Sequence, residues 1–257
     1  MNTDLETKQI NTIRTLALDA VKRANSGHSG TAMALAPLAH VLYTQFLKYD
    51  SSDPTWPDRD RLVLSAGHAS MLLYSMLFLT GYGLELDDIK DFRQLGSRTP
   101  GHPEVGVTPG VEVTTGPLGQ GLANAVGMAM AERHLQARLG KEIIDHKTWV
   151  ICGDGDLMEG ISHEAASFAG HQKLGNLIAI YDDNKITIDG ETNLTVSDDP
   201  QKRFEAYGWH VINIGDAAED LSALELGLKA ARDETQRPSL LIMRSHIGYP
   251  APNAVDT

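Results

Sequence analysis

The sequence predicts an α/β protein: a three-layer sandwich in which a mostly parallel central sheet has helices on both faces. Two observations predict this class. Short apolar stretches with strand character alternate with longer stretches whose apolar residues recur at helical spacing. Two of the short stretches end in polar turns, one containing Asp154 and the other Asn184, and open α/β sheets bind ligands at such strand ends.

The first part of the chain is predicted to be mainly helical. Apolar residues recur at helical spacing from Ile10 to Val21, and a polar run that begins at Asn25 ends this helix. A second helix is expected over residues 32–47. After a proline-containing loop, a strand is expected over residues 61–65 and a third helix over residues 69–79.

A long segment rich in glycine and proline covers residues 96–113. Loops of this length in compact domains are usually functional, so we expect it to remain irregular and to serve the site. Residues 122–139 are predicted to form a strong helix. Its small residues, such as Ala125 and Gly127, would allow close packing against another element.

One βαβ unit is expected in the middle of the chain. Residues 148–152 and 177–181 are predicted strands, and the helix-length segment 159–173 joins them. Parallel strands joined in this way end at the same edge of the sheet, so the polar turns after them should lie together. Later strands are expected over residues 209–214 and 239–243, with a helix over residues 220–233 between them.

The two polar turns contain oxygen ligands suited to a divalent metal on a diphosphate. Asp154 lies between two glycines, and Asn184 follows thirty positions later. Mg²⁺ and Ca²⁺ take hard oxygen ligands, and Mg²⁺ typically uses one or two carboxylates with phosphate oxygens and water. Asp154 offers charge, Asn184 offers a neutral amide oxygen, and the carbonyl of Ile186 could supply a third oxygen. Gly155 lets the backbone approach an anion and exposes amides near the start of the following helix.

The segments around these residues resemble one enzyme family. A Gly-Asp-Gly sequence followed about thirty residues later by Asn is typical of enzymes that use thiamine diphosphate, and the flanking segments resemble transketolases in particular. The similarity runs from the first helix to about Asn253 and involves several motifs in the family's order. These motifs are residues 26–28, 67–68, 99–104, 114–121, 158–164, 174–178 and 181–190.

This resemblance implies the thiamine diphosphate-binding fold and a thiamine diphosphate cofactor held with Mg²⁺, or with Ca²⁺ or another divalent ion. The metal ligands expected are Asp154, Asn184 and Ile186. In the family, the segment matching residues 116–118 lies along the cofactor, and Glu159 resembles an acidic residue at the subunit interface that links paired active sites. The cofactor-binding residues expected are His68, Gly116, Pro117, Leu118, Gly155, Glu159 and Asn184.

Three histidines lie beside glycine in predicted loops: His28, His68 and His102. A single loop histidine is more often structural than catalytic, and the resemblance is what assigns all three as catalytic. In transketolases the matching histidines line the channel over the thiazolium ring, bind the donor sugar's oxygens and the cofactor, and help to move protons. Neutral imidazole can both donate and accept, as such work requires. His246 lies outside these motifs and is expected to be structural or peripheral.

The resemblance covers one part of a longer enzyme. A transketolase subunit has three consecutive α/β domains, and residues 1–257 are expected to form most of the first, the diphosphate-binding domain, incomplete at its carboxyl end. The reaction implied for the whole enzyme is transfer of a two-carbon ketol unit between ketose and aldose phosphates. Because the family's pyrimidine-binding domain and its activating glutamate are missing from this sequence, the chain alone is expected to be inactive.

The partners implied by the resemblance are sugar phosphates and the missing domains. Those domains would come from a separate carboxyl-terminal subunit or from the remainder of a longer chain. The expected assembly is a homodimer or, with a separate subunit, a heterotetramer.

Three other functions match parts of the sequence. A dinucleotide-binding dehydrogenase needs Gly-x-Gly-x-x-Gly, but Gly160 follows Gly153 and Gly155 two positions too late. A 1-deoxy-xylulose-5-phosphate synthase shares Gly-Asp-Gly and the early histidines, although residues 181–190 favour transketolase. A degenerate, non-catalytic assembly domain would keep the fold, but it would not require the metal ligands or the loop histidines.

Composition and charge narrow the function classes further. With 34 acidic and 22 basic residues the formal charge is −12 and the pI is near 5.2, so we expect no binding to nucleic acid or membranes. The amino terminus has no targeting pattern and no run of eighteen apolar residues occurs, so a cytoplasmic protein is expected. Cys152, in an apolar strand, is expected to be buried and inert. Two residues depart from the family pattern, Ser29 in place of proline and Asp156 in place of a neutral residue, and neither changes the assignment.

Overall fold

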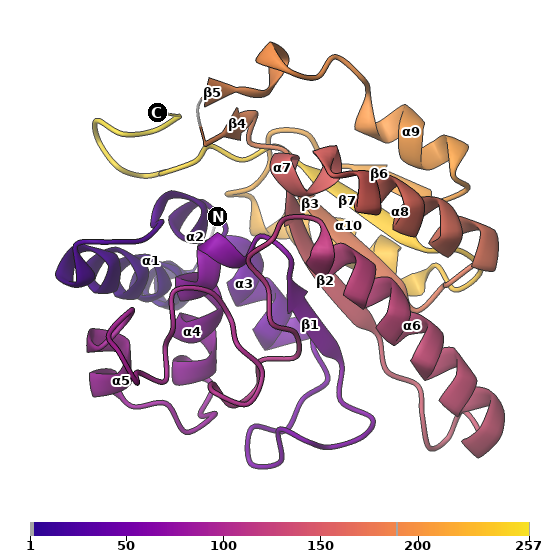
Figure 1. Ribbon diagram of the computed structural model, residues 1–257, viewed down its shortest axis with the longest axis horizontal. Helices are drawn as coiled ribbons and strands as arrows, with labels where there is room; N and C mark the ends of the chain where they lie inside the picture. The colour runs from indigo at the N-terminus through magenta and orange to yellow at the C-terminus, as the bar shows by residue number, and fades with distance from the viewer. Residues whose placement is uncertain (1–2, 189, 257) are drawn as a thin grey trace.

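The computed structural model describes residues 3–188 and 190–256. At its centre lies a five-stranded sheet in the order β1-β2-β3-β7-β6, and each neighbouring pair of strands is parallel. Helices cover both faces of the sheet (Figure 1), which confirms the predicted three-layer α/β sandwich. The strands are β1 (Arg61–Leu64), β2 (Thr148–Gly153), β3 (Leu177–Asp182), β6 (His210–Asn213) and β7 (Ser239–Met243), each end within one residue of the prediction.

The strand register brings the two polar turns to the same edge. β2 and β3 pair from Thr148 opposite Leu177 to Gly153 opposite Asp182, so the two strands end at the same level. β1 pairs in parallel with the other side of β2. The segments that follow β1, β2 and β3 therefore leave the sheet at the same edge, which is the arrangement that the βαβ interpretation predicted for β2 and β3.

Among the described residues, no helix is both long and apolar enough to cross a membrane.

Each face of the sheet has its own set of helices. The first face is covered by α1 (Asp4–Ala24), α2 (Gly30–Ala34), α3 (Ala36–Val41), the π-helix η1 (Leu42–Phe46), α4 (Ser70–Leu79) and α10 (Leu221–Asp233). The second face is covered by α6 (Gln120–Leu139), α7 (Asp154–Met158), α8 (Gly160–Gln172) and α9 (Pro200–Ala206).

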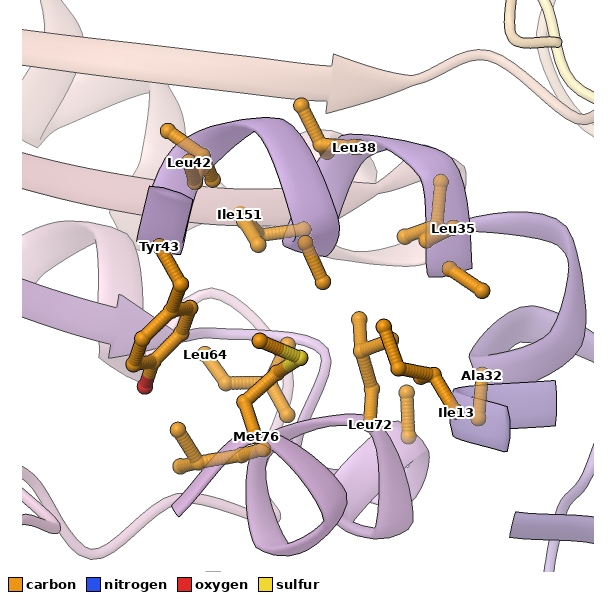
Figure 2. Packing of buried hydrophobic residues seen from close by; sticks show 14 of the residues in the cluster. Ile13, Ala32, Leu35, Leu38, Leu42, Tyr43, Leu64, Leu72, Met76 and Ile151 are labelled. Carbon is orange, nitrogen blue, oxygen red and sulfur yellow. The ribbon is translucent and has the colours of Figure 1, made fainter. Parts of the chain in front are cut away.

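Alternate residues of each strand pack into the two cores. In β2, Trp149 and Ile151 belong to the core on the first face, whereas Val150 and Cys152 belong to the core on the second. Figure 2 shows the first core, where side chains of α1, α3 and α4 surround Ile151 and its neighbour from β1. Cys152 is fully buried, as expected, and burial raises the pKa of its thiol.

The single helix predicted over residues 32–47 is wrong. The segment is broken at Leu35 into α2 and α3, and it ends in η1. Pro37 explains the break, because proline has no N–H and its ring crowds the carbonyl four residues earlier, that of Met33. That carbonyl instead accepts a hydrogen bond from Nε of Arg14 at 3.1 Å. A side chain of α1 thus satisfies the carbonyl that the proline leaves without a helical partner.

The helix predicted over residues 159–173 is divided differently. α7 begins at Asp154, directly after β2, and the extended backbone of Glu159 (φ −69°, ψ 139°) separates it from α8.

Residues 96–113 form no helix or strand, as predicted. Elements too short to show a period were not predicted: η2 (Gly67–Ala69), α5 (Leu86–Lys90), β4 (Ile186–Thr187), β5 (Gly190–Glu191), η3 (Thr192–Leu194) and α9.

One buried carboxyl near the amino ends of the strands has an unusual pKa. Glu132 of α6 is 3% exposed, and its oxygens accept hydrogen bonds from Nε2 of Gln136, at 3.1 Å, and from Nδ2 of Asn176. Burial, followed by the negative charge of Asp145, raises the pKa of Glu132 to about 7. The group therefore changes its charge near neutral pH.

We expect Glu132→Gln to change the pH dependence of stability. Because the folded-state pKa lies above the ordinary value of 4.5, this group stabilises the fold fully below that pH and loses the contribution as the pH rises through about 7. The variant cannot lose this contribution. The difference in free energy of unfolding, variant minus unaltered chain, should therefore increase by about 1–3 kcal/mol between about pH 5 and pH 8. Urea unfolding at several pH values measures the difference.

The matched control is Glu142→Gln, which removes a carboxyl on the surface. If both variants show the same pH dependence as the unaltered chain, Glu132 does not titrate as described.

Candidate functional site

Asp156 joins three segments at the carboxyl edge of the sheet. Its carboxylate is fully buried, and Oδ1 accepts hydrogen bonds from Oγ of Ser65 at 2.6 Å and from the backbone N–H of Gly119 at 2.8 Å. Oδ2 accepts one from the backbone N–H of Gly153 at 3.0 Å. Ser65 follows β1, Gly119 precedes α6, and Gly153 is the last residue of β2. Burial raises the pKa of Asp156, and the three hydrogen bonds oppose this shift.

The role of Asp156 was missed in the sequence, where it counted only as a small departure from a family pattern. A signal was present, because Asp156 lies three residues after Gly153. An acidic side chain at that position of a helix can accept a hydrogen bond from the N–H of the capping residue.

Asp154 contacts the loop after β3, as the spacing predicted. Its side chain is 6% exposed, and Oδ1 accepts a hydrogen bond from the hydroxyl of Tyr181 at 2.7 Å. Its Oδ2 accepts one from the backbone N–H of Lys185 at 3.0 Å. Burial raises the pKa of Asp154, and the nearby charge of Asp183 adds to the shift.

Asn184 is held in one orientation beside this carboxylate. Its Nδ2 donates to Oδ2 of Asp182 at 2.8 Å, and its Oδ1 accepts a hydrogen bond from the backbone N–H of Ile186 at 2.9 Å. Because Asp182 accepts from the nitrogen, the amide oxygen is directed toward the following residues. Asp154, Asn184 and Ile186 thus belong to one connected cluster.

The charge of this cluster fits a bound cation. Three carboxylates, those of Asp154, Asp182 and Asp183, lie together, and Lys185 pairs with Asp183 at 2.6 Å. Burial raises the pKa of Asp182 to about 6, and the charges of the other two carboxylates contribute. A divalent cation would relieve their mutual repulsion.

The chemistry of the donors restricts which cation fits. Within residues 3–188 and 190–256, no three His, Cys, Asp or Glu side chains are grouped so that they could hold a metal ion. The cluster instead combines carboxylates with the amide oxygen of Asn184, and all of these are hard ligands. Such a set suits Mg²⁺ or Ca²⁺ when further oxygens, such as those of a diphosphate, complete the coordination.

The segment from Gly116 to Leu118 runs from the histidines to α7. Gly116 has φ 151°, a conformation that favours glycine, and a Cβ on it would lie 3.5 Å from the ring of His102. At the other end, a Cβ on Gly155 would lie 2.8 Å from Cδ1 of Leu118. Pro117 lies between these two contacts. The segment that was expected to follow the cofactor therefore connects the two candidate halves of the site.

The three histidines meet in space, although His28 and His102 lie in separate loops and His68 lies in the short helix η2. The rings of His28 and His68 make an edge contact with centroids 5.4 Å apart. Burial, followed by the neighbouring His28 and His102, lowers the pKa of His68 to about 4. Burial and then the charge of Arg93 lower the pKa of His28 and of His102. All three imidazoles are therefore neutral at pH 7 and can both donate and accept hydrogen bonds.

Glu159 and His246 belong neither to the group of carboxylates nor to the group of three histidines. Glu159 is exposed, and within the described residues its side chain makes no hydrogen bond. A Cβ on Gly119 would lie 2.8 Å from Cβ of Glu159, which places Glu159 beside the start of α6. His246 bonds to Asp256 at 2.7 Å and to Asp216 at 3.3 Å, a peripheral position, as expected.

Comparisons with known proteins identify the family of this chain. The family model described as the thiamine diphosphate binding domain of transketolase matches residues 5–257. The transketolase of Geobacillus stearothermophilus is 56% identical over 256 residues, which are 98% of this chain and 38% of that protein. Transketolase 2 of Escherichia coli is 58% identical over 246 residues, which are 95% of this chain and 37% of that protein.

Solved structures show the same fold. The transketolase of Campylobacter jejuni matches with a TM-score of 0.96 and 49% identity, covering 100% of this chain and 40% of that one. A Pichia stipitis transketolase in complex with sedoheptulose-7-phosphate matches with a TM-score of 0.95 and 49% identity, covering 98% of this chain and 37% of that one. The chain thus spans well under half the length of these relatives. Over the part that it spans, it belongs to the transketolase family and matches that family's thiamine diphosphate-binding domain.

Proposed function

We propose that this chain is the diphosphate- and metal-binding half of a transketolase, which transfers a two-carbon ketol unit between ketose and aldose phosphates. The observation that carries the proposal is the buried pair of Asp154 and Asn184 at adjacent strand ends, in a chain of this family. The sugar phosphate bound by the Pichia stipitis relative supports this substrate class. The relatives compared above are named transketolases, which favours this function over the synthase and over a non-catalytic assembly domain.

We call Asp154, Asp182, Asp183, Asn184 and Ile186 the acidic cluster. It holds Mg²⁺, or Ca²⁺, through Asp154, Asn184 and the carbonyl of Ile186. The carboxylate supplies charge and the two neutral oxygens complete the protein's share, so that diphosphate oxygens fill the remaining positions. Gly155 brings the backbone amides of α7 close to the same anion. Asp182 has no direct contact with the metal in this proposal and acts by orienting the amide of Asn184.

The cofactor lies along Gly116, Pro117 and Leu118, between the acidic cluster and the histidines. When bound, thiamine diphosphate supplies the electron-accepting chemistry that breaking and forming the carbon–carbon bond requires. His68 contacts the cofactor, and Glu159 links it to a paired site across a subunit interface. The exposed position of Glu159 beside α6 is consistent with an interface role.

The imidazoles of His28, His68 and His102 bind and orient the oxygens of the donor sugar. Since all three rings are neutral at pH 7, a ring nitrogen can accept a hydroxyl proton while the other ring nitrogen donates a hydrogen bond. The edge contact between His28 and His68 keeps two of the rings close enough to serve one substrate.

The remaining parts of the enzyme come from another chain or from further residues of the same one. They supply the pyrimidine-binding domain and the residues that bind the sugar phosphate. The assembly is a homodimer, or a heterotetramer if the domains are on separate chains. The outer face of α6 fits such an interface, because it exposes Met130 and Leu135 near a shallow hollow bordered by Ala123, Gly127 and Met128.

We expect the purified chain to bind thiamine diphosphate only with a divalent metal, and Asp154→Asn to weaken this binding by at least about tenfold. The reason is that the variant loses the one charged ligand of the metal, and tenfold corresponds to about 1.4 kcal/mol. Isothermal titration calorimetry with Mg²⁺, and again after chelation, measures both effects.

Asp183→Asn is the matched control for Asp154→Asn. It removes a neighbouring carboxylate whose Oδ1 lies 2.9 Å from the same Tyr181 hydroxyl and which already pairs with Lys185. An equal loss of affinity in both variants would mean that the local charge matters and that Asp154 is not a specific ligand.

We expect the purified chain alone to show no ketol transfer from a ketose phosphate to an aldose phosphate. The residues that activate the cofactor's pyrimidine lie in the family's second domain, so binding can persist without turnover. A coupled assay of the released aldose phosphate measures this. Steady turnover by the chain alone that is abolished in Asp154→Asn would refute the proposal that ketol transfer requires the other domains.

A further inference from the structure

Arg93 lies between the loops that carry two of the histidines. Its Nη1 donates a hydrogen bond to Oγ of Ser26 at 2.8 Å. A Cβ on Gly27 would lie 3.5 Å from Nε of Arg93, and a Cβ on Gly101 would lie 3.0 Å from the same atom. Gly27 and Gly101 directly precede His28 and His102. The guanidinium therefore packs against the backbone immediately before each of these histidines.

Arg93 has no carboxylate partner within the described residues. No ion pair there includes it, and its Nε is buried without a hydrogen-bond acceptor. Arg98, in the same segment, is paired conventionally: its Nη1 lies 3.1 Å from Asp88 and donates to the carbonyl of Gly83 at 2.8 Å. Arg93 as a whole is half-buried and its hydrogen bond to Ser26 is exposed, so only the Nε side of the guanidinium is enclosed by the protein.

The backbone also holds Arg93 in place. Its φ is 62°, in the left-handed region that is uncommon for residues other than glycine. Its N–H donates to the carbonyl of Thr99 at 3.0 Å, across the turn that leads to Gly101 and His102. The backbone of Arg93 is thus fixed by the turn, and the contacts of its side chain with Ser26, Gly27 and Gly101 show that it extends between the two loops.

We propose that Arg93 is a positioning residue for the histidine site: it anchors the loops that carry His28 and His102 and places a fixed positive charge beside both imidazoles. The inference rests on the proposed function for its catalytic meaning.

The fixed charge disfavours protonation of the two rings. Burial is the larger cause of the lowered pKa of His28 and of His102, and Arg93 is the next. Among residues 3–188 and 190–256, the other titratable groups that act on the three rings are the histidines themselves, and no carboxylate contributes. Both rings therefore stay neutral, and able to accept a proton, at a lower pH than burial alone would allow.

The test is an NMR titration of the histidine ring resonances in this chain, assigned with single His→Gln variants. In Arg93→Met, we expect the pKa values of His28 and His102 to rise by roughly 0.5–1 pH unit, because the repelling charge is gone. In Arg93→Lys, which keeps a positive charge on a flexible side chain, the two histidine pKa values should rise by no more than about half as much. Thermal unfolding followed by circular dichroism shows whether each variant is folded.

Arg98→Met is the matched control, and it should leave both histidine pKa values unchanged. Unchanged pKa values in folded Arg93→Met would overturn the proposal, and so would equal rises in Arg93→Met and Arg93→Lys. If Arg93→Met does not fold, Arg93→Gln takes its place with the same expectation, because its amide can still donate to Ser26 without carrying charge.

Calorimetry with thiamine diphosphate on the unaltered chain separates this inference from the proposed function. Failure of the chain to bind cofactor, together with the expected histidine shifts, would reject the proposed function and keep the positioning role. Cofactor binding with unmoved histidine pKa values would reject the role of Arg93 alone.

Discussion

The site depends on one buried carboxylate, that of Asp156. Removing a carboxylate from water is costly, and it is tolerated here because donors from Ser65, Gly119 and Gly153 converge on it. Hydrogen bonds to a charged group contribute about 1.5–3 kcal/mol each, so the three segments cannot shift independently without losing one. Asp156 therefore holds three segments at fixed positions relative to one another: the loop after β1, the end of β2 and the residues just before α6. The acidic cluster and the segment 116–118 both extend from these fixed points.

Burial acts in opposite directions on the two halves of the site, because it always disfavours the charged form. In the acidic half it raises the pKa of Asp154 and of Asp182, so their ionised forms are destabilised and a bound cation would stabilise them. In the histidine half it lowers the pKa of His68 and its neighbours, which leaves neutral rings. One half is thus suited to a metal and a diphosphate, and the other to hydroxyl groups that exchange protons. The short segment 116–118 joins them.

The strands were predicted almost to the residue, because a short apolar run bounded by polar turns is a local pattern that a buried parallel sheet preserves. The helix over residues 32–47 was wrong, since apolar spacing continues through Pro37 while the backbone cannot. The placement of Asp154 beside the loop of Asn184 was predictable because parallel strands in one βαβ unit end at one edge. Asp156 was missed because two of its three donors, Ser65 and Gly119, come from segments that the sequence does not relate to it, and only Gly153 is local.

The sequence by itself determined the α/β class, the order of the strands along the chain, and the residue types at the strand ends. Only the tertiary structure decided which loops meet. His28, His68 and His102 come together, and Arg93 lies against two of their loops, because helices and strands far apart in the chain pack into one body. The pKa of each group follows from that packing, since burial and neighbouring charge exist only once the chain is folded.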